Sequence, residues 1–261
     1  MNSHLRLDAP LLTTALAAAP WAGFWPLAGA AVACVGVHAW AILDPRSQLD
    51  GPVIWRLGAD AAALALTFDD GPGEATPAIL DRLARSGMHA TFFVIGENAR
   101  RHPDLLRRIA GEGHAVGLHS LGHDRRFPLR GPAALVRDLE ENRRILADLL
   151  GAPPLPLLRP PMGLVSPTVG VAARRCGLHL VTWTASGRDG GATTPTRILA
   201  RLERGLRPGA ILVLHDGAEP GRTRDVAPTL AALDVLLPRL HEAGSPSRAL
   251  TVVDGAVRLA P

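Results

Sequence analysis

The sequence predicts an α/β protein folded as a deformed (β/α) barrel with about seven parallel strands, preceded by an N-terminal apolar membrane segment. Two observations from residue 63 onward predict the barrel. Short, almost continuously apolar runs alternate with longer runs of helical periodicity, as parallel strands covered by helices require. Polar residues follow several of the apolar runs, and a parallel barrel builds its active site from residues that follow its strands. An open, doubly wound sheet is the alternative.

The expected elements follow one another along the chain. We expect strands at residues 63–68, 90–95, 115–118, 157–159, 179–183, 210–214 and 249–253. We expect helices at residues 76–86, 97–112, 132–150, 166–176, 194–206 and 226–243. Ser166 and Thr194 each precede a proline, and a capping hydroxyl followed by proline is a typical helix start.

The N-terminal part differs from this pattern. The 35 residues between Asp8 and Asp44 contain no Asp, Glu or Arg, and about 20 mainly apolar residues are enough for a membrane-spanning helix. We therefore expect a membrane segment over residues 1–43, either a short hairpin or one span over about 25–43. A signal peptide cleaved after residues 17–19 and a buried helical hairpin are the alternatives.

This organisation predicts three parts: the membrane segment, a linker over residues 44–62 with a short extended piece at 52–55, and a catalytic domain over residues 63–261. The expected location is a bacterial-type envelope, with the protein anchored in the membrane. We favour the periplasmic or extracellular face, although the charge bias around the segment does not decide the orientation.

Composition excludes several kinds of chemistry. All 28 basic residues are Arg, and the chain has neither Lys nor Tyr. A Schiff-base lysine, a phosphate-loop lysine and a phenol acid are therefore excluded. No basic run contains interleaved aromatic residues, so we expect no nucleic-acid partner, and no protein partner is evident. Cys34 and Cys176 form neither a metal-binding pair nor a disulfide framework.

The first expected strand runs into two adjacent carboxylates, Asp69 and Asp70, followed by a Gly-Pro turn. Adjacent like charges repel unless a cation or an arginine offsets them. The third expected strand runs into His119 and His123, and histidines at this spacing can face one metal ion. One Asp and two His leave a position open for water, as catalytic zinc requires.

A second carboxylate beside such a site can accept the proton of metal-activated water. The expected strand at 210–214 ends in His215, which would place an imidazole at the same face. A site of two His and one carboxylate also suits iron and oxygen chemistry. The additional carboxylate and the late histidine favour hydrolysis.

These motifs together resemble the polysaccharide deacetylases, which are carbohydrate esterase family 4 or the NodB homology domain. The similar motifs are Thr-Phe-Asp-Asp-Gly-Pro from Thr67, His-Ser-x-x-His from His119, Arg-x-Pro-x-Gly from Arg159 and the strand ending in His215. The resemblance covers about residues 52–254. It implies a deformed (β/α) barrel and metal-dependent removal of an N- or O-acyl group from a sugar.

Carried over by motif position, the resemblance also implies roles for individual residues. They are the base at Asp69, metal ligands at Asp70, His119 and His123, the acid at His215, the arginine that holds the base at Arg159, and a main-chain oxyanion donor at Met162. The family usually has an aromatic residue where Met162 stands. Its Asp-x-x-Asp-Trp motif is replaced by residues 186–190, where Asp189 is the candidate that orients the catalytic histidine. Trp183 is the candidate replacement for the missing tryptophan.

We therefore expect a hydrolase that uses a divalent metal, zinc for preference, to remove N-acetyl or other acyl groups from an N-acetylated glycan or sugar amide. A deacylase or deformylase of a lipid-linked sugar is an alternative within the same class. The alternative from another class is an inactive, membrane-anchored glycan-binding module. The intact set of carboxylates and histidines favours an enzyme.

Overall fold

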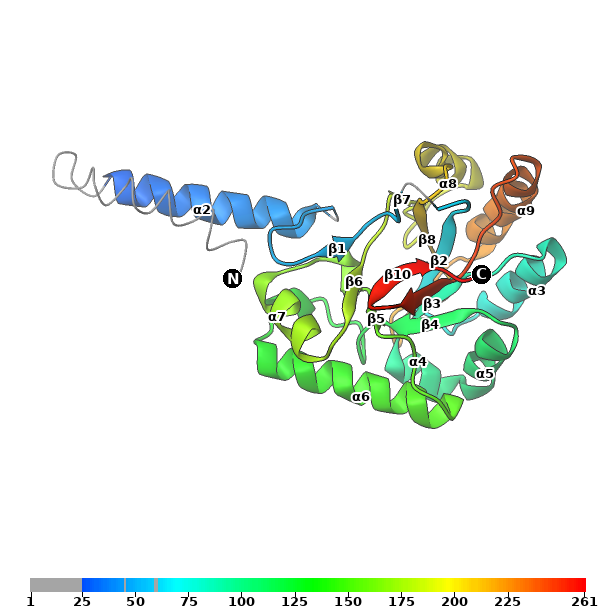
Figure 1. Ribbon diagram of the computed structural model, residues 1–261, viewed down its shortest axis with the longest axis horizontal. Coiled ribbons are helices and arrows are strands. Elements are labelled where there is room, and N and C mark those ends of the chain that lie inside the picture. Colours follow the sequence, from blue (N-terminus) through cyan, green and yellow to red (C-terminus); the bar gives the residue numbers. More distant parts are fainter. Residues whose placement is uncertain (1–24, 45, 59–60) are drawn as a thin grey trace.

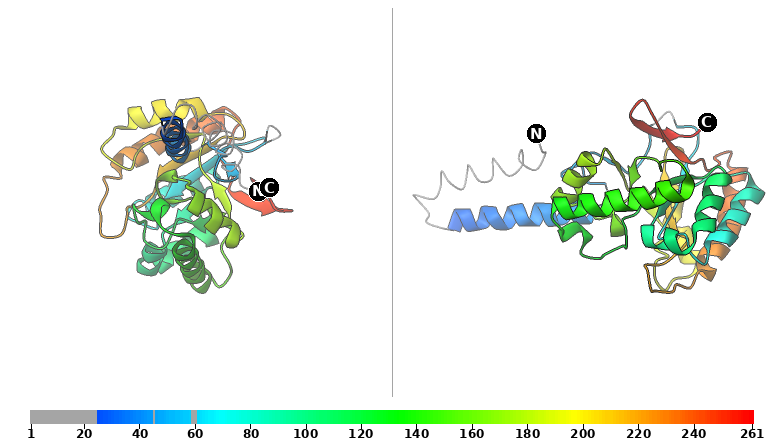
Figure 2. Two further views of the ribbon diagram at one scale, coloured as in Figure 1. Left: turned by 90° about the vertical axis from the view of Figure 1, so that its left-hand side faces the viewer. Right: turned by 90° about the horizontal axis from the view of Figure 1, so that it is seen from below.

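The computed structural model describes residues 25–44, 46–58 and 61–261. Its centre is one eight-stranded, curled sheet with helices around the outside (Figures 1 and 2). The strands are β1 Val53–Ile54, β2 Ala65–Asp69, β3 Thr91–Val94, β4 Ala115–Leu118, β5 Leu157–Leu158, β6 His179–Val181, β7 Ala185–Ser186 and β8 Ile211–His215. Their order is β1-β6-β5-β4-β3-β2-β8-β7, and each neighbouring pair is parallel.

The sheet is an incomplete barrel, because its edge strands β1 and β7 do not pair with each other. The expectation of a deformed barrel is confirmed in this coarse sense, but its strand list needs correction. The run at 249–253 forms β9 Leu250–Val253, which pairs with β10 Ala256–Leu259 in a separate antiparallel hairpin. Strands β1 and β7 take its place in the sheet. Each is two residues long, which is too short for a periodic pattern in the sequence.

The helices of the barrel are α3 Thr76–Ser86, α4 Gly96–Arg101, α5 Pro103–Gly111, α6 Pro132–Leu150, α7 Pro167–Arg175, α8 Pro195–Leu202 and α9 Ala227–Glu242. The single helix expected at 97–112 is two helices, because Pro103 forces His102 out of the helical region to φ −130° and ψ 56°. The predicted caps are confirmed. The Ser166 hydroxyl accepts a hydrogen bond from the Val169 N–H, and the Thr194 hydroxyl accepts one from the Arg197 N–H.

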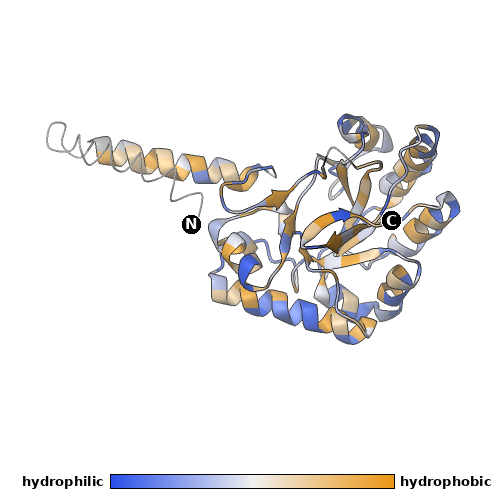
Figure 3. Cartoon of the chain, viewed as in Figure 1, coloured by the Kyte–Doolittle hydropathy of each residue, from blue (hydrophilic) through white to orange (hydrophobic). Residues whose placement is uncertain are grey.

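Alternation along the strands creates two apolar cores. Leu66 and Phe68 of β2 pack outward against the helices, whereas Ala65 faces the interior of the barrel. Figure 3 shows the strands as mostly hydrophobic and α6 as a mixture of hydrophobic and hydrophilic residues. The buried residues of the inner core are Leu57, Ala65, Phe93, Leu157, Val181, Ile211 and Leu250. Apolar residues of the β9–β10 hairpin pack against this inner core from the side where the strands begin.

The same alternation directs polar side chains into the barrel. Because side chains alternate along a strand, Asp69 lies on the same face as Ala65, Arg159 on the same face as Leu157, and His215 on the same face as Ile211. All three therefore lie on the interior face, at the ends where the strands finish. The alternation that buries apolar residues on both faces of the sheet therefore also places these three candidate catalytic groups inside the barrel.

N-terminal to the barrel, α2 Trp25–Leu43 extends away from the sheet (Figures 1 and 2). No helix within the described ranges has both the length and the hydropathy that crossing a membrane needs. The expected membrane segment is therefore not supported. The features expected within residues 1–24, the first half of a hairpin and a cleavage site, lie outside the described residues.

Candidate active site

The ends of β2, β4, β5 and β8 gather the predicted residues around one cavity of about 170 Å³. Six of the predicted residues line this cavity: Asp69, Asp70, His119, His123, Met162 and His215. The other two, Arg159 and Asp189, are buried behind it and contact residues that line it. The structure therefore brings all eight predicted positions into one site, although it does not by itself assign their roles.

Asp70, His119 and His123 form a cluster that suits a metal ion. The Asp70 Oδ1 atom lies 3.3 Å from His119 Nε2 and 3.5 Å from His123 Nε2. The three potential ligand atoms lie within 4.8 Å of one another, and all three residues are buried. Asp70 Oδ1 has no hydrogen-bond partner among the described residues. Because a buried carboxylate oxygen without a partner is costly, this donor set fits a divalent cation.

The environment fixes a tautomer and shifts the pKa values of the three residues. Burial lowers the pKa of His119, but the carboxylates of Asp69 and Asp70 raise it by more. His119 Nδ1 lies 2.7 Å from the main-chain oxygen of Arg159. A carbonyl oxygen only accepts, so Nδ1 carries a hydrogen, and in the neutral imidazole Nε2 presents its lone pair to the cluster. Burial raises the pKa of Asp70, but the surrounding histidines lower it by more, so its net pKa lies below the usual range. Burial and the neighbouring His119 lower the pKa of His123, which favours the neutral imidazole.

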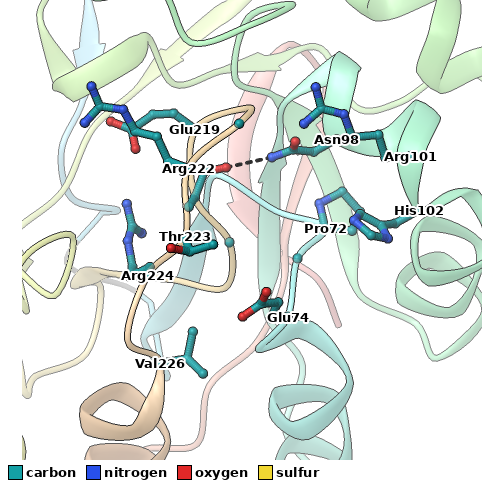
Figure 4. Close-up of a pocket in the computed structure, with 14 residues that line it drawn as sticks. Pro72, Glu74, Asn98, Arg101, His102, Glu219, Arg222, Thr223, Arg224 and Val226 are labelled. Atoms are coloured by element: carbon teal, nitrogen blue, oxygen red, sulfur yellow. Dashed lines mark hydrogen bonds between the residues drawn. The ribbon is translucent and has the colours of Figure 1, made fainter.

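Two further residues hold Asp70, and the sequence did not indicate either. The Arg224 guanidinium donates to Asp70 Oδ2 at 2.9 Å, which leaves Oδ1 for the cluster. Asn98 of α4 donates to the main-chain oxygens of Asp70 and Ala218, at 2.7 and 2.9 Å. Asn98 and Ala218 both line a second cavity of about 110 Å³, which Figure 4 draws with Asn98 labelled. Neither residue belongs to a quoted motif, so only the fold reveals them.

Asp69 is held by a buried arginine. Arg159 Nη1 donates to Asp69 Oδ1 and to the Thr67 hydroxyl, both at 2.7 Å. Its Nη2 donates to the main-chain oxygen of Thr182 at 2.9 Å, and its guanidinium lies 4.1 Å from the Phe93 ring centroid. Burial lowers the pKa of Arg159 and the charge of Asp69 opposes this effect. Arg159 therefore fixes one oxygen of Asp69 and so orients the whole carboxylate.

His215 is held by Asp189. His215 Nδ1 lies 2.8 Å from Asp189 Oδ1, and Asp189 Oδ2 accepts from the His215 main-chain N–H at 3.0 Å. The Thr229 hydroxyl at the start of α9 donates to the same Oδ2 at 2.8 Å. Burial lowers the pKa of His215, but the carboxylates of Asp189, Asp70 and Asp69 together raise it by more, to about 9. The imidazole therefore carries a proton at neutral pH, and its Nε2 is available to the cavity.

Glycine supplies space at two points of the site. A Cβ at Gly71, next to Asp70, would clash with the carboxylate of Asp216, which is buried there and accepts from the Thr76 hydroxyl. Burial, and the charge of Asp70 to a smaller degree, raise the pKa of Asp216 to about 7. At Gly163, which has φ +68°, a Cβ would clash with the Trp183 ring. Trp183 can therefore form a wall of the cavity.

Met162 belongs to the short 3-10 turn Pro161–Gly163 and has φ 58°. The hydrogen bonds of this turn come from the N–H groups of Gly163 and Leu164, so they leave the Met162 N–H for another acceptor. Met162 is 42% exposed and lines the cavity. A main-chain donor at the rim can stabilise an oxyanion.

Comparison with known proteins agrees with this arrangement. A family profile described as polysaccharide deacetylase matches residues 58–181. A chitooligosaccharide deacetylase of Sinorhizobium fredii is 34% identical over 201 residues, which are 75% of this chain and 93% of the relative. A peptidoglycan-N-acetylglucosamine deacetylase of Bacillus cereus is 31% identical and covers 76% of this chain and 92% of its own length.

The chain belongs to the polysaccharide deacetylase family. As a member, it is a carbohydrate deacetylase of the carbohydrate esterase class. A family 4 carbohydrate esterase from Streptomyces lividans, solved with acetate, superposes with a TM-score of 0.67 and 28% identity and covers 78% of this chain and all of its own. The Bc1960 peptidoglycan N-acetylglucosamine deacetylase superposes with a TM-score of 0.68 and 29% identity, over 76% of this chain and 90% of that one.

Proposed function

We propose that this polysaccharide deacetylase hydrolyses the N-acetyl groups of N-acetylglucosamine units in a glycan, with Asp69 as general base and His215 as general acid. One observation carries the proposal. Asp69 and His215 are register partners on the adjacent strands β2 and β8, and both line the cavity beside the metal-type cluster. Each is fixed by a buried group of opposite charge, Arg159 and Asp189 respectively. The site thus offers an oriented carboxylate and a protonated imidazole side by side, as amide hydrolysis needs.

The proposed metal is zinc, held by Asp70, His119 and His123, because two imidazoles and one carboxylate form a typical catalytic zinc set. When bound, such a cation would polarise the acyl carbonyl and lower the pKa of water to about 7. The support for this assignment is the chemistry of the donors and the unpartnered Asp70 Oδ1.

The chain's own residues would then move the protons. Asp69 accepts a proton from the attacking water as its oxygen bonds to the acyl carbon. The Met162 N–H donates to the carbonyl oxygen as that oxygen gains negative charge. The C–N bond then breaks, and His215 Nε2 donates its proton to the departing nitrogen. The products are acetate and a free amine on the sugar, and the proton on Asp69 returns to solvent or to His215.

The substrate class rests on the named relatives, which act on chitooligosaccharides and on peptidoglycan N-acetylglucosamine. We extend that class to this chain because the relatives and this chain share most of their lengths. Location in the cell envelope stays a prediction.

Adjacent carboxylates allow a matched test. With the full chain loaded with zinc, Asp69→Asn should retain bound metal but lose at least about 100-fold in acetate release from chitotetraose, because general-base catalysis contributes that much. Asp70→Asn should lose both the metal and the activity. Bound metal is measured by elemental analysis and acetate by a coupled assay.

Asp104→Asn is the control, because this carboxylate is 95% exposed on α5 and lies outside the site. It should match the unchanged protein in both measurements. Full turnover by Asp69→Asn would contradict the base assignment. If the zinc-loaded, unchanged chain released no acetate from any N-acetylated glycan, the proposed function would be wrong and the glycan-binding alternative would gain support.

A further inference from the structure

A groove of about 530 Å³ adjoins the active-site cavity. It lies beside the opening of the barrel. Its lining comes from the segment before edge strand β1, from edge strand β7 and the residues on either side of it, and from α8 with the turn after it. Trp183 and Ser186 line both the groove and the active-site cavity. A ligand that extends from the site past these two residues therefore enters the groove.

The lining of this groove is strongly basic. We call it the seam groove and define it by its four arginines, Arg46, Arg188, Arg201 and Arg204. The one carboxylate in its lining is that of Asp44, whose Oδ1 accepts from the main-chain N–H of Arg46. Arginine keeps its charge at any physiological pH, so the groove carries an excess of positive charge.

This charge is not neutralised within the part of the chain that the structure describes. None of the four guanidinium groups forms an ion pair with a described carboxylate. Arg201 donates to main-chain oxygens of Gly187 and Arg188, which are neutral acceptors. Several arginines outside the groove do pair with carboxylates: Arg144 of α6, for example, pairs with both Glu141 and Asp148.

The turn that carries Asp189 also forms part of the groove. Arg188 has φ 50°, in the left-handed region that non-glycine residues rarely adopt. In this conformation Asp189 is buried against His215 while the neighbouring Arg188 is exposed in the groove. Arg201 holds the turn through the Gly187 and Arg188 oxygens. One turn thus both lines the groove and holds the proposed acid His215 through Asp189.

We infer that the seam groove is a subsite for an oxyanion, a phosphate or a carboxylate, carried by the same glycan whose acyl group is removed. This inference rests on the proposed function and narrows its substrate to an anionic N-acetylated glycan. The planar guanidinium binds both phosphate and carboxylate through paired hydrogen bonds. The shared wall at Trp183 and Ser186 makes the occupant an extension of the reacting glycan.

The test compares matched tetrasaccharides on the full, zinc-loaded chain. The probes are neutral chitotetraose, its four positional isomers with one C6 phosphate, and its four isomers with one C6 oxidised to a carboxylate. At least one anionic isomer should have a kcat/KM about tenfold above that of the neutral probe, the size that one charge-assisted pair gives. The phosphate and carboxylate sets show which oxyanion the groove prefers.

The double variant Arg188→Gln/Arg204→Gln should reduce this ratio to about one. The exposed Arg175 of α7 lies outside the groove, and Arg175→Gln should retain the ratio. The advantage should also fall as salt rises from about 0.01 to 0.15 M, because screening weakens exposed charge pairs. Equal kcat/KM for the neutral and all anionic probes, or an advantage that survives the double variant, would overturn the inference.

Binding of the same probes, measured by calorimetry, separates this inference from the proposed function. Tighter binding of an anionic probe that depends on the arginines, without acetate release from any probe, would support the groove and contradict the deacetylase. Acetate release from all probes with equal dissociation constants would support the deacetylase and contradict the groove.

Discussion

Arg159 connects both halves of the site. Its side chain donates to Asp69, and its main-chain oxygen accepts from His119. Its guanidinium has no exposed surface and is surrounded by strand oxygens and by the Phe93 ring. One residue therefore orients the candidate base and sets the tautomer of a candidate ligand, so its substitution should affect folding as well as chemistry.

Arg159→Met should lower the free energy of unfolding by about 3–5 kcal/mol, because it leaves the carboxylate of Asp69 buried without its partner. Urea denaturation of the metal-free chain measures this change. Arg175→Met, at an exposed position of α7, should change stability by no more than about 0.5 kcal/mol. If Arg159→Met does not fold, Arg159→Lys keeps the charge and should lie between the two. A loss below about 1 kcal/mol for Arg159→Met would contradict the structural role.

Residue types in the sequence indicated the positions that gather at this cavity, whereas their backbone conformation could not be predicted. Among the described residues, six non-glycine residues have positive φ, and five of them lie at or next to the site: Asp70, Ser120, His123, Met162 and Arg188. Left-handed backbone costs such residues about 1–2 kcal/mol each. In a sequence, glycine is the usual sign of this conformation, but here residues with side chains that belong to the site or its surroundings occupy these positions. The surrounding fold holds the strained conformations.

Loops that follow the strands position the acid. Asp189 comes from the turn after β7, Thr229 from the first turn of α9, and His215 from the end of β8. These three elements meet only in the folded barrel. Motif resemblance indicated His215 and Asp189, but Thr229 and Arg224 act from positions without a motif, so the sequence did not reveal them.

The Asp189 turn predicts a pH effect. Because Asp189, together with Asp70 and Asp69, raises the pKa of His215 to about 9, activity should fall as pH rises through that pKa, when the acid loses its proton. Asp189→Asn removes the charge and should move the alkaline limb of kcat/KM toward the ordinary histidine value of 6.5. A bound cation lowers the pKa of His215, and with it the pH of the alkaline limb, in both proteins. The comparison is therefore made between zinc-loaded forms.

The control for this experiment is Asp225→Asn, which makes the same change of charge at an exposed loop position. Its alkaline limb should not move. The same linkage affects stability: the raised pKa of His215 stabilises the fold fully below pH 6.5, and this contribution is lost as pH rises through about 9. An unmoved limb in Asp189→Asn would show that another group is the acid.

At the scale of the whole molecule, the fold was predictable where elements are long and not where they are short. Helix α6 has the expected bounds, and six expected strand regions lie in the sheet. Edge strands β1 and β7 have two residues each and become strands through their neighbours β6 and β8. The β9 run has an ordinary strand pattern, and the sequence could not indicate that it would leave the barrel to pair with β10.

The metal cluster predicts a global stability effect. Since its ligands come from separate elements after β2 and β4, a cation binds the folded state and not the unfolded chain. At a free zinc concentration 100 times its dissociation constant, binding should add about 2.7 kcal/mol and raise Tm by about 5–10 °C. Differential scanning calorimetry with and without a chelator measures the shift.

Asp104→Asn should keep this shift and Asp70→Asn should lose it. A chelator-sensitive shift of the same size in Asp70→Asn would mean that zinc stabilises the chain at some other place. The comparison needs no substrate, so it tests the cluster even if the glycan is unknown.

The β9–β10 hairpin, which packs under the inner core, has a consequence for how a polymer is handled. Among the described residues, it closes the end of the barrel opposite the candidate site, so the proposed substrate would reach the cavity from the rim. On the proposed function, a long glycan would lie across the rim, and one acetamido group at a time would enter the cavity above Arg159. Chain ends are not needed for such an encounter. The architecture therefore suits an endo-acting enzyme that modifies internal units of an intact polymer.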